Sequence, residues 1–120
     1  MRSPLPGSLA AVFALALLAS CSQRTHRLGI DLRPDSWVMV LVEGERASVH
    51  LRNLGPGAVH ATIEATRDPT RLAHYDLERG ALVAQGLSGP FRVTLETRDE
   101  PARIDFEAQG ADGIAFDGVD

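Results

Sequence analysis

The stretch FRVTLETRDEPARIDFEA, Phe91 to Ala108, contains two segments in which apolar and polar residues alternate, separated by the polar residues RDEP. A period of two places successive side chains on opposite faces of a β-strand, so each segment is expected to form a strand with one buried face. We expect the two strands to pair as an antiparallel hairpin with Leu95 opposite Ile104. The same register gives the pairs Val93 with Phe106, Phe91 with Ala108, Glu96 with Arg103, Thr94 with Asp105 and Arg92 with Glu107. Because one register satisfies apolar and charged partners together, it favours a β-sheet protein.

The same period continues upstream of this hairpin. WVMVLVE, residues 37–43, is a nearly continuous apolar strand suited to the middle of a sheet. RASVHLRN and AVHATIEAT alternate on either side of the glycine-rich LGPG, and we expect a second hairpin with Leu51 opposite Val59. Its remaining pairs would be Val49 with Ala61, Ala47 with Ile63, His50 with His60 and Arg46 with Glu64.

Between the two hairpins the pattern is weaker. We expect short strands over residues 72–77 and 81–85, joined around Glu78-Arg79-Gly80. A helix over residues 68–79 is the alternative, since Asp68 could cap it and Pro69 could open it. A last short strand is expected at residues 114–116, which makes seven or eight strands in all.

This number of short strands with regular turn signals predicts an all-β fold, a small antiparallel β-sandwich. Few aromatic residues are available, so the core should be mainly Val, Leu, Ile and Ala, anchored by Trp37, Phe91, Phe106 and Phe116. The segment ASVHLRNLGPGAVHATI, residues 47–63, resembles the strand, Asn-x-Gly-x-Gly, strand core of immunoglobulin-like bacterial adhesion modules. That resemblance covers less than a fifth of the chain and implies an immunoglobulin-like sandwich.

The N-terminal region has a different pattern. Residues 9–18, LAAVFALALL, are ten apolar residues without a charge, preceded by Arg2. As a helix they would span about 15 Å, half of a hydrocarbon core of about 30 Å. The length instead matches the apolar region of a secretory signal peptide. The alternative is a buried N-terminal helix.

LASC, Leu18-Ala19-Ser20-Cys21, holds the only cysteine of the chain and resembles the bacterial lipobox. The resemblance implies that Leu18, Ala19 and Ser20 occupy the signal-peptidase pocket. Cys21 would then receive a diacylglyceryl group on sulfur, become the new N-terminus and carry further acyl chains such as palmitate. Ser22 in place of an aspartate implies sorting to the outer membrane, facing the periplasm.

The expected organisation is therefore a signal peptide over residues 1–20, a lipidated tether over 21–36 and a β-sandwich domain over 37–120. The single cysteine excludes an intramolecular disulfide and thiolate-rich zinc sites. A net charge of −4 gives no electrostatic footprint for nucleic acid, although all 12 basic residues are arginine.

Few residues suggest chemistry. The expected register would place His50 beside His60 on the solvent face, where two imidazoles could share a Zn or Cu ion, although two ligands do not make a site. GLSGP, residues 86–90, imitates a serine-hydrolase elbow, but Pro90 stands in place of the last glycine and a turn is expected. Asp112, Asp117 and Asp120 lie among glycines, where carboxylates can hold calcium, although their spacing matches no EF-hand and acidic turns explain them.

We therefore expect no enzyme, no metal and no cofactor. The expected function is a membrane-anchored envelope lipoprotein, held in the bilayer through Cys21, whose sandwich serves as a protein-interaction or structural accessory module. The alternative is a lipoprotein that binds a small ligand or a metal on the His50/His60 face.

Overall fold

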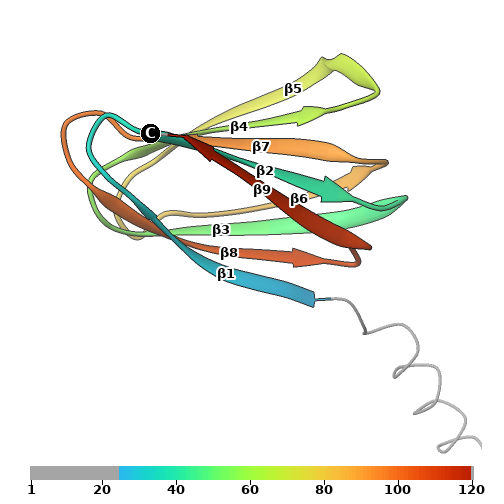
Figure 1. Cartoon of the computed structure of the whole chain (residues 1–120), viewed down its shortest axis with the longest axis horizontal. Coiled ribbons are helices and arrows are strands. Elements are labelled where there is room, and N and C mark those ends of the chain that lie inside the picture. Colours follow the sequence, from blue (N-terminus) through green and yellow to red (C-terminus); the bar gives the residue numbers. More distant parts are fainter. Residues whose placement is uncertain (1–24, 120) are drawn as a thin grey trace, which may run out of the picture.

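The alternating segments form nine β-strands in a computed structural model that describes residues 25–119 (Figure 1). The strands are β1 (Thr25–Leu32), β2 (Trp37–Glu43), β3 (Arg46–Pro56), β4 (Val59–Ala65), β5 (Asp68–Leu77), β6 (Leu82–Ser88), β7 (Phe91–Glu96), β8 (Ala102–Gln109) and β9 (Gly113–Val119). The predicted signal peptide and the residues predicted to form a lipobox, Leu18, Ala19, Ser20 and Cys21, lie outside the described residues. Within residues 25–119 there is no helix long and apolar enough to cross a bilayer.

The strands form two antiparallel sheets, which confirms the predicted all-β sandwich. One sheet has the order β1-β8-β3-β6 and the other the order β5-β4-β7-β2-β9. Every connection except β4–β5 passes from one sheet to the other. This is the strand order of a jelly roll. The connectivity differs from the immunoglobulin-like arrangement, which keeps several successive strands side by side within one sheet.

Both expected hairpins are wrong in their strand pairing. β7 pairs with β2 and β4, whereas β8 pairs with β1 and β3, so Leu95 lies beside Val38 and Ala61 instead of Ile104. Likewise β3 and β4 belong to different sheets, and Leu51 lies beside Phe106 and Val83. The residues expected to point inward do so, but their neighbours within each sheet are not the expected ones.

The expected charge pairs change with the register. Arg92 lies near Glu64, with 3.7 Å between nitrogen and oxygen, and not beside Glu107. Glu107 accepts a hydrogen bond of 2.8 Å from Arg27 Nε. A further pair joins Arg103 to Asp31 at 2.7 Å. Each of these pairs lies between neighbouring strands of one sheet, as exposed cross-strand pairs do.

The core lies between the two sheets and is aliphatic, with Phe91 and Phe106 fully buried in it. Trp37 and Phe116 do not anchor it, since 36% and 56% of their surface is exposed. In β2 the valines at 38, 40 and 42 face inward, so Trp37 faces outward by alternation. Phe116 lies on β9, an edge strand of the five-stranded sheet, where the four-stranded sheet provides less cover.

Residues 25–36 are not a tether. Residues 25–32 form β1, whose eight residues all pair with β8. Ser36 is buried, and its backbone nitrogen donates to Thr97 Oγ1 over 3.2 Å. Thr97 N in turn donates to Ser36 O over 2.9 Å. The first described strand of the sandwich therefore begins at Thr25, within the segment that was expected to be a tether.

The region of residues 68–79 is extended and not helical, since β5 covers Asp68–Leu77. The expected strands near residues 72–77, 81–85 and 114–116 are confirmed within β5, β6 and β9, and Gly80 supplies a positive φ of 89° in the β5–β6 connection.

The strands run between two ends of the sandwich. The loop end holds the connections β1–β2, β3–β4, β5–β6 and β7–β8, and the turn end holds β2–β3, β4–β5, β6–β7 and β8–β9. β1 starts at the turn end, so the chain enters the domain there (Figure 1).

The buried side chain of Asn53 stabilises the loop end through hydrogen bonds. It is fully buried, and its Nδ2 donates to Gly57 O over 2.9 Å and to Leu77 O over 2.8 Å. Its Oδ1 accepts from Gly55 N over 2.7 Å. The side chain thereby joins the end of β3 to the end of β5 in the opposite sheet, and this role explains the Asn-x-Gly-x-Gly sequence.

Candidate functional site

A row of four side chains crosses the outer face of the five-stranded sheet next to the loop end. Asp76 of β5 pairs with His60 of β4, His60 with Glu96 of β7, and Glu96 with Trp37 of β2. Neighbouring strands are about 4.8 Å apart, so the four side chains form a continuous strip. The strip places one indole, one imidazole and two carboxylates on the same surface.

The loops beyond this row turn the strip into a groove of about 620 Å³. Asp35 and Ser36 come from the β1–β2 loop, Glu78 follows β5, and the β7–β8 loop supplies residues 97–100. The residues that line the groove are Asp35, Ser36, Trp37, Ala58, Val59, His60, Asp76, Glu78, Glu96, Thr97, Arg98, Asp99 and Glu100.

Backbone hydrogen bonds hold the groove walls. Asp35 N donates to Arg98 O over 2.6 Å, which joins the β1–β2 loop to the β7–β8 loop. Gly57 N donates to Pro101 O over 2.9 Å, which joins the β3–β4 loop to the same wall. The loops that form the groove are therefore hydrogen-bonded to one another.

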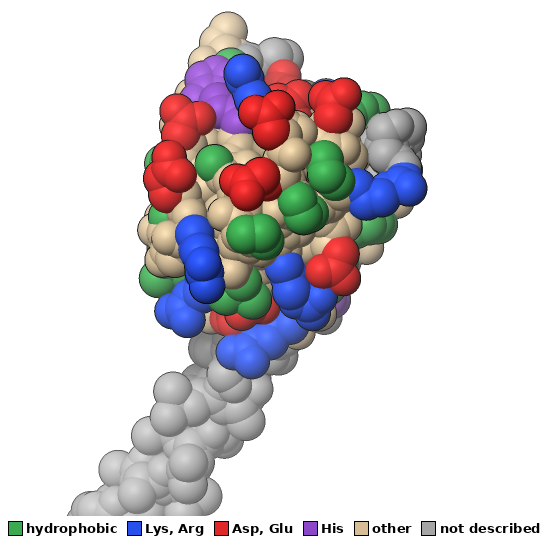
Figure 2. Space-filling view, turned by 90° about the vertical axis from the view of Figure 1, so that its left-hand side faces the viewer, with side chains coloured by type: hydrophobic (Ala, Val, Ile, Leu, Met, Phe, Trp, Pro, Cys, Tyr) green, Lys and Arg blue, Asp and Glu red, His purple; other side chains and the backbone are tan. Residues whose placement is uncertain are grey.

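The groove is strongly acidic. Six carboxylates line it, those of Asp35, Asp76, Glu78, Glu96, Asp99 and Glu100, against the single guanidinium of Arg98. Figure 2 views the loop end and shows acidic side chains gathered over its upper part, next to histidine. Carboxylates around an exposed indole suit a ligand that carries positive charge, because a cation can pair with the carboxylates and lie over the ring face.

Two histidines stand at one side of the groove. His60 Nδ1 and Asp76 Oδ1 are 2.7 Å apart, and His74 Nδ1 lies 3.3 Å from Thr62 Oγ1. The two imidazole rings stack with centroids 5.5 Å apart and planes at 23°. The stack and its two hydrogen bonds fix the orientation of His60 at the groove.

The prediction that His50 and His60 are neighbours on one sheet is wrong. His50 lies on β3 beside Ala84 and Glu107 in the four-stranded sheet, whereas His60 lies on β4 in the other sheet. The two imidazoles therefore share no surface and cannot hold one ion or ligand. Among residues 25–119, no three His, Cys, Asp or Glu side chains are grouped so that they could hold a metal ion.

The other candidates take ordinary structural positions. Residues 86–88 continue β6, and Gly89 has a φ of 78° in the turn to β7, so no strand-to-helix elbow forms at GLSGP. Asp112 N donates to Glu43 O in the turn before β9. The side chains of Asp117 and Asp120 are outside what the structure describes. Glu96 lines the groove instead of pairing with Arg103.

Glu107 has a perturbed pKa on the outer face of the four-stranded sheet. A hydrogen bond from Gln109 Nε2 is the main cause that lowers the pKa of this carboxyl, and the hydrogen bond from Arg27 adds to it. Arg27 and Glu107 are paired across β1 and β8. This cluster serves strand register, because Glu107 is engaged on both oxygens.

Sequence reasoning did not find the groove. Its carboxylates lie in three separate segments of the chain, at residue 35, residues 76–78 and residues 96–100, and each segment alone resembles the polar end of a strand or an ordinary turn. Trp37 is a local signal for the groove. It lies on the same face of its strand as Met39 and on the opposite face from the buried valines, so a large aromatic side chain is placed on the solvent side of the sheet.

One of the comparisons with known proteins supports the fold. No protein-family model matches the chain, and no curated protein matches it. Among solved structures, procruciferin, the 11S globulin of Brassica napus, is similar with a TM-score of 0.56 and 17% identity over 79% of this chain. The match spans 22% of procruciferin. A de novo designed double-stranded β-helix gives a TM-score of 0.41 and 18% identity over 72% of this chain and 97% of its own. At this identity, the likeness to procruciferin shows the fold alone.

Proposed function

We propose that this protein is a non-enzymatic lipoprotein of the bacterial envelope, in the outer membrane and facing the periplasm, which binds a cationic segment of a partner protein in the loop-end groove. The anchor is Cys21, for the reasons given by the LASC sequence. The observation that carries the binding function is the groove itself, with its six carboxylates, one guanidinium and exposed Trp37.

The positions of the chain entry and of the groove at opposite ends of the domain support this arrangement. β1 begins at the turn end with Thr25, which is the fourth residue after Cys21. An extended chain covers at most about 3.6 Å per residue, so the anchor sulfur lies within roughly 15 Å of the turn end. The groove lies at the loop end, one strand length away. An acylated Cys21 would thus leave the groove facing away from the membrane, accessible to a soluble or envelope-bound partner.

An arginine side chain of such a partner fits the groove in two ways. Its guanidinium can form ion pairs with Glu96 and Asp99 while it stacks on the indole of Trp37. Each exposed ion pair contributes up to about 1 kcal/mol and weakens as salt is added. Binding should therefore need several positive charges at once and should be salt-dependent.

Trp37 is the only tryptophan of the chain, so its fluorescence reports on the groove directly. We expect hexa-arginine to change the emission of the detergent-solubilised lipoprotein, with an affinity that falls as salt rises, and hexa-glutamate to leave it unchanged. The double variant Glu96→Gln with Asp99→Asn should bind hexa-arginine more weakly, by up to about 30-fold for two ion pairs. Glu43→Gln is the matched control, because Glu43 is an exposed carboxylate on the same strand as Trp37 but at the turn end.

Equal binding by the double variant and by the native protein would contradict the groove assignment. A response to hexa-glutamate as strong as that to hexa-arginine would contradict its charge preference.

A further inference from the structure

A second concave surface lies at the turn end, opposite the groove. It is a depression of about 440 Å³ lined by Arg46, Ala47, Ser48, Arg71, Gly86, Leu87, Ser88 and Gln109. Its polar lining consists of two guanidiniums, two hydroxyls and one amide, without a carboxylate. This composition is the reverse of the acidic groove.

Strand pairing holds the lining in place. Ser48 of β3 pairs with Gln109 of β8 on one side and with Gly86 of β6 on the other, and Arg46 pairs with Ser88. Three adjacent strands of one sheet therefore supply most of the depression.

Arg71 is supplied by β5, at the edge of the other sheet. The edges β5 and β6 are joined by a hydrogen bond from the Tyr75 hydroxyl to Gln85 Oε1. Arg46 and Arg71 thus approach the same depression from the two sheets.

Both guanidiniums are available for a ligand. Within residues 25–119, neither the Arg46 nor the Arg71 side chain has a hydrogen bond or an ion pair. Two nearby carboxylates are already engaged, since Glu107 binds Arg27 and Gln109, and Asp68 accepts from Thr70 over 2.6 Å. Glu45, next to Arg46 in the chain, is exposed and outside the lining.

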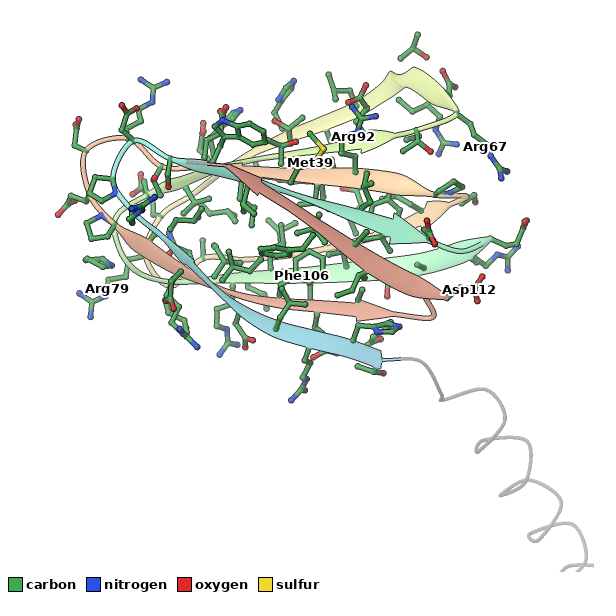
Figure 3. The ribbon with its side chains drawn as sticks, in the orientation of Figure 1. Met39, Arg67, Arg79, Arg92, Phe106 and Asp112 are labelled. Atoms are coloured by element: carbon green, nitrogen blue, oxygen red, sulfur yellow. The ribbon has the colours of Figure 1, made fainter. Side chains whose placement is uncertain are left out.

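The depression lies beside the point where the anchor enters the domain. Thr25, the first residue of β1, pairs with Gln109, which lines the depression. In the labelled view of Figure 3, Arg67 and Asp112 mark this turn end and Arg79 marks the opposite end. A lipid attached to Cys21 would bring the bilayer surface to this side of the sandwich.

We propose that Arg46 and Arg71 bind the phosphate of an anionic lipid headgroup in the membrane that holds the acylated Cys21. Guanidinium forks match phosphate oxygens in two parallel hydrogen bonds, and the hydroxyls of Ser48 and Ser88 can donate to the same group. The inference rests on the proposed anchor. It adds that the domain has a fixed orientation on the membrane, with the turn end on the lipid headgroups and the acidic groove directed away from them.

The test uses the mature lipoprotein in nanodiscs and the NMR signals of the arginine Nε–H groups. In discs that contain phosphatidylglycerol, the signals of Arg46 and Arg71 should shift, whereas discs of phosphatidylcholine alone should leave them near their positions in detergent. One arginine near an anionic surface changes affinity about fivefold. The fraction of phosphatidylglycerol that gives half of the Arg46 shift should therefore rise about fivefold in Arg71→Gln. Arg79→Gln is the control at the opposite end and should leave that fraction unchanged.

A second arm separates the sources of phosphate. Inorganic phosphate is added to the protein in phosphatidylcholine discs. If millimolar phosphate shifts both arginine signals and phosphatidylglycerol does not, the site takes a soluble phosphate and the lipid assignment is overturned. If neither probe shifts them, there is no phosphate site. The N-terminal mass of the same sample reports on the acylation of Cys21, so a failure of the anchor is distinguished from a failure of the depression.

Discussion

Replacing Asn53 by alanine removes a side chain that connects the two sheets by hydrogen bonds at the loop end. The amide is fully buried, donates to Gly57 O and Leu77 O, and accepts from Gly55 N at distances of 2.7–2.9 Å. The variant leaves these three backbone groups without that partner. Because the site lies under the loops, water can replace the amide only if the loop end opens.

The magnitude follows from the three bonds. Each hydrogen bond contributes about 1 kcal/mol net, and a buried group left without a partner costs about 1–3 kcal/mol. We therefore expect Asn53→Ala to lower the free energy of unfolding by about 3–5 kcal/mol. That is a large part of the stability of a small domain, which is typically about 5–15 kcal/mol.

Urea unfolding, followed by the emission of Trp37, measures this loss. Two variants make the result specific. Asn53→Asp keeps the volume but places an oxygen against two carbonyl oxygens, so at neutral pH it should lose at least as much as the alanine variant. Leu54→Ala removes a neighbour that is 47% exposed and should cost less than about 1 kcal/mol. A loss below about 1 kcal/mol for Asn53→Ala, or a stable Asn53→Asp, would refute the hydrogen-bond account.

Two further predictions use the core and the outer face of the four-stranded sheet. Phe106→Ala should lower the free energy of unfolding by about 3–5 kcal/mol, because Phe106 is fully buried. Phe116→Ala should lower it by less than about 1 kcal/mol, because Phe116 is 56% exposed. Equal losses of stability in thermal unfolding would contradict the assigned core. Gln109→Leu should raise the pKa of Glu107 toward its ordinary value in an NMR titration, since the Gln109 hydrogen bond is the main cause that lowers it. Because that pKa is lowered in the folded state, ionised Glu107 stabilises the fold above its ordinary pKa of 4.5, and this contribution is lost as pH falls through the folded pKa. The Gln109→Leu variant should accordingly show a smaller stability difference between neutral and acidic pH, and an unchanged Glu107 titration would show that the hydrogen bond has no effect.

The sequence predicts which face of each strand is buried, because alternation depends only on the local chain. Leu95 and Ile104 were both assigned to the core and both are fully buried there. Alternation does not say which sheet receives a strand. A hairpin and a crossover between sheets place the same residues inward, so the partners of Leu95 could not be chosen from the pattern alone.

Edge strands are also hard to recognise from alternation, because both of their faces can be partly polar. THRLGIDL, residues 25–32, alternates weakly and carries charges because β1 is an edge strand with an exposed outer face. Such a strand resembles a polar linker until its partner β8 is known. Most of residues 68–79, the range Asp68–Leu77, likewise forms the edge strand β5, and its sequence is compatible with both a helix and a strand.

The groove could not be predicted for a related reason. Asp35 and Asp99 are far apart in the chain and meet only because the β1–β2 and β7–β8 loops bond to one another through Asp35 N and Arg98 O. A charge pattern along the chain contains no trace of that contact. The LASC motif, in contrast, is local and contiguous, so the prediction of a lipobox needs no knowledge of the fold.

Intact mass spectrometry of the protein extracted from bacterial membranes tests the central claim most directly, since the proposed acylation of Cys21 would determine which end of the sandwich meets the bilayer. The account predicts a chain that starts at Cys21 and carries the added mass of two or three acyl chains. A soluble chain that retains Met1 and an unmodified thiol would contradict it.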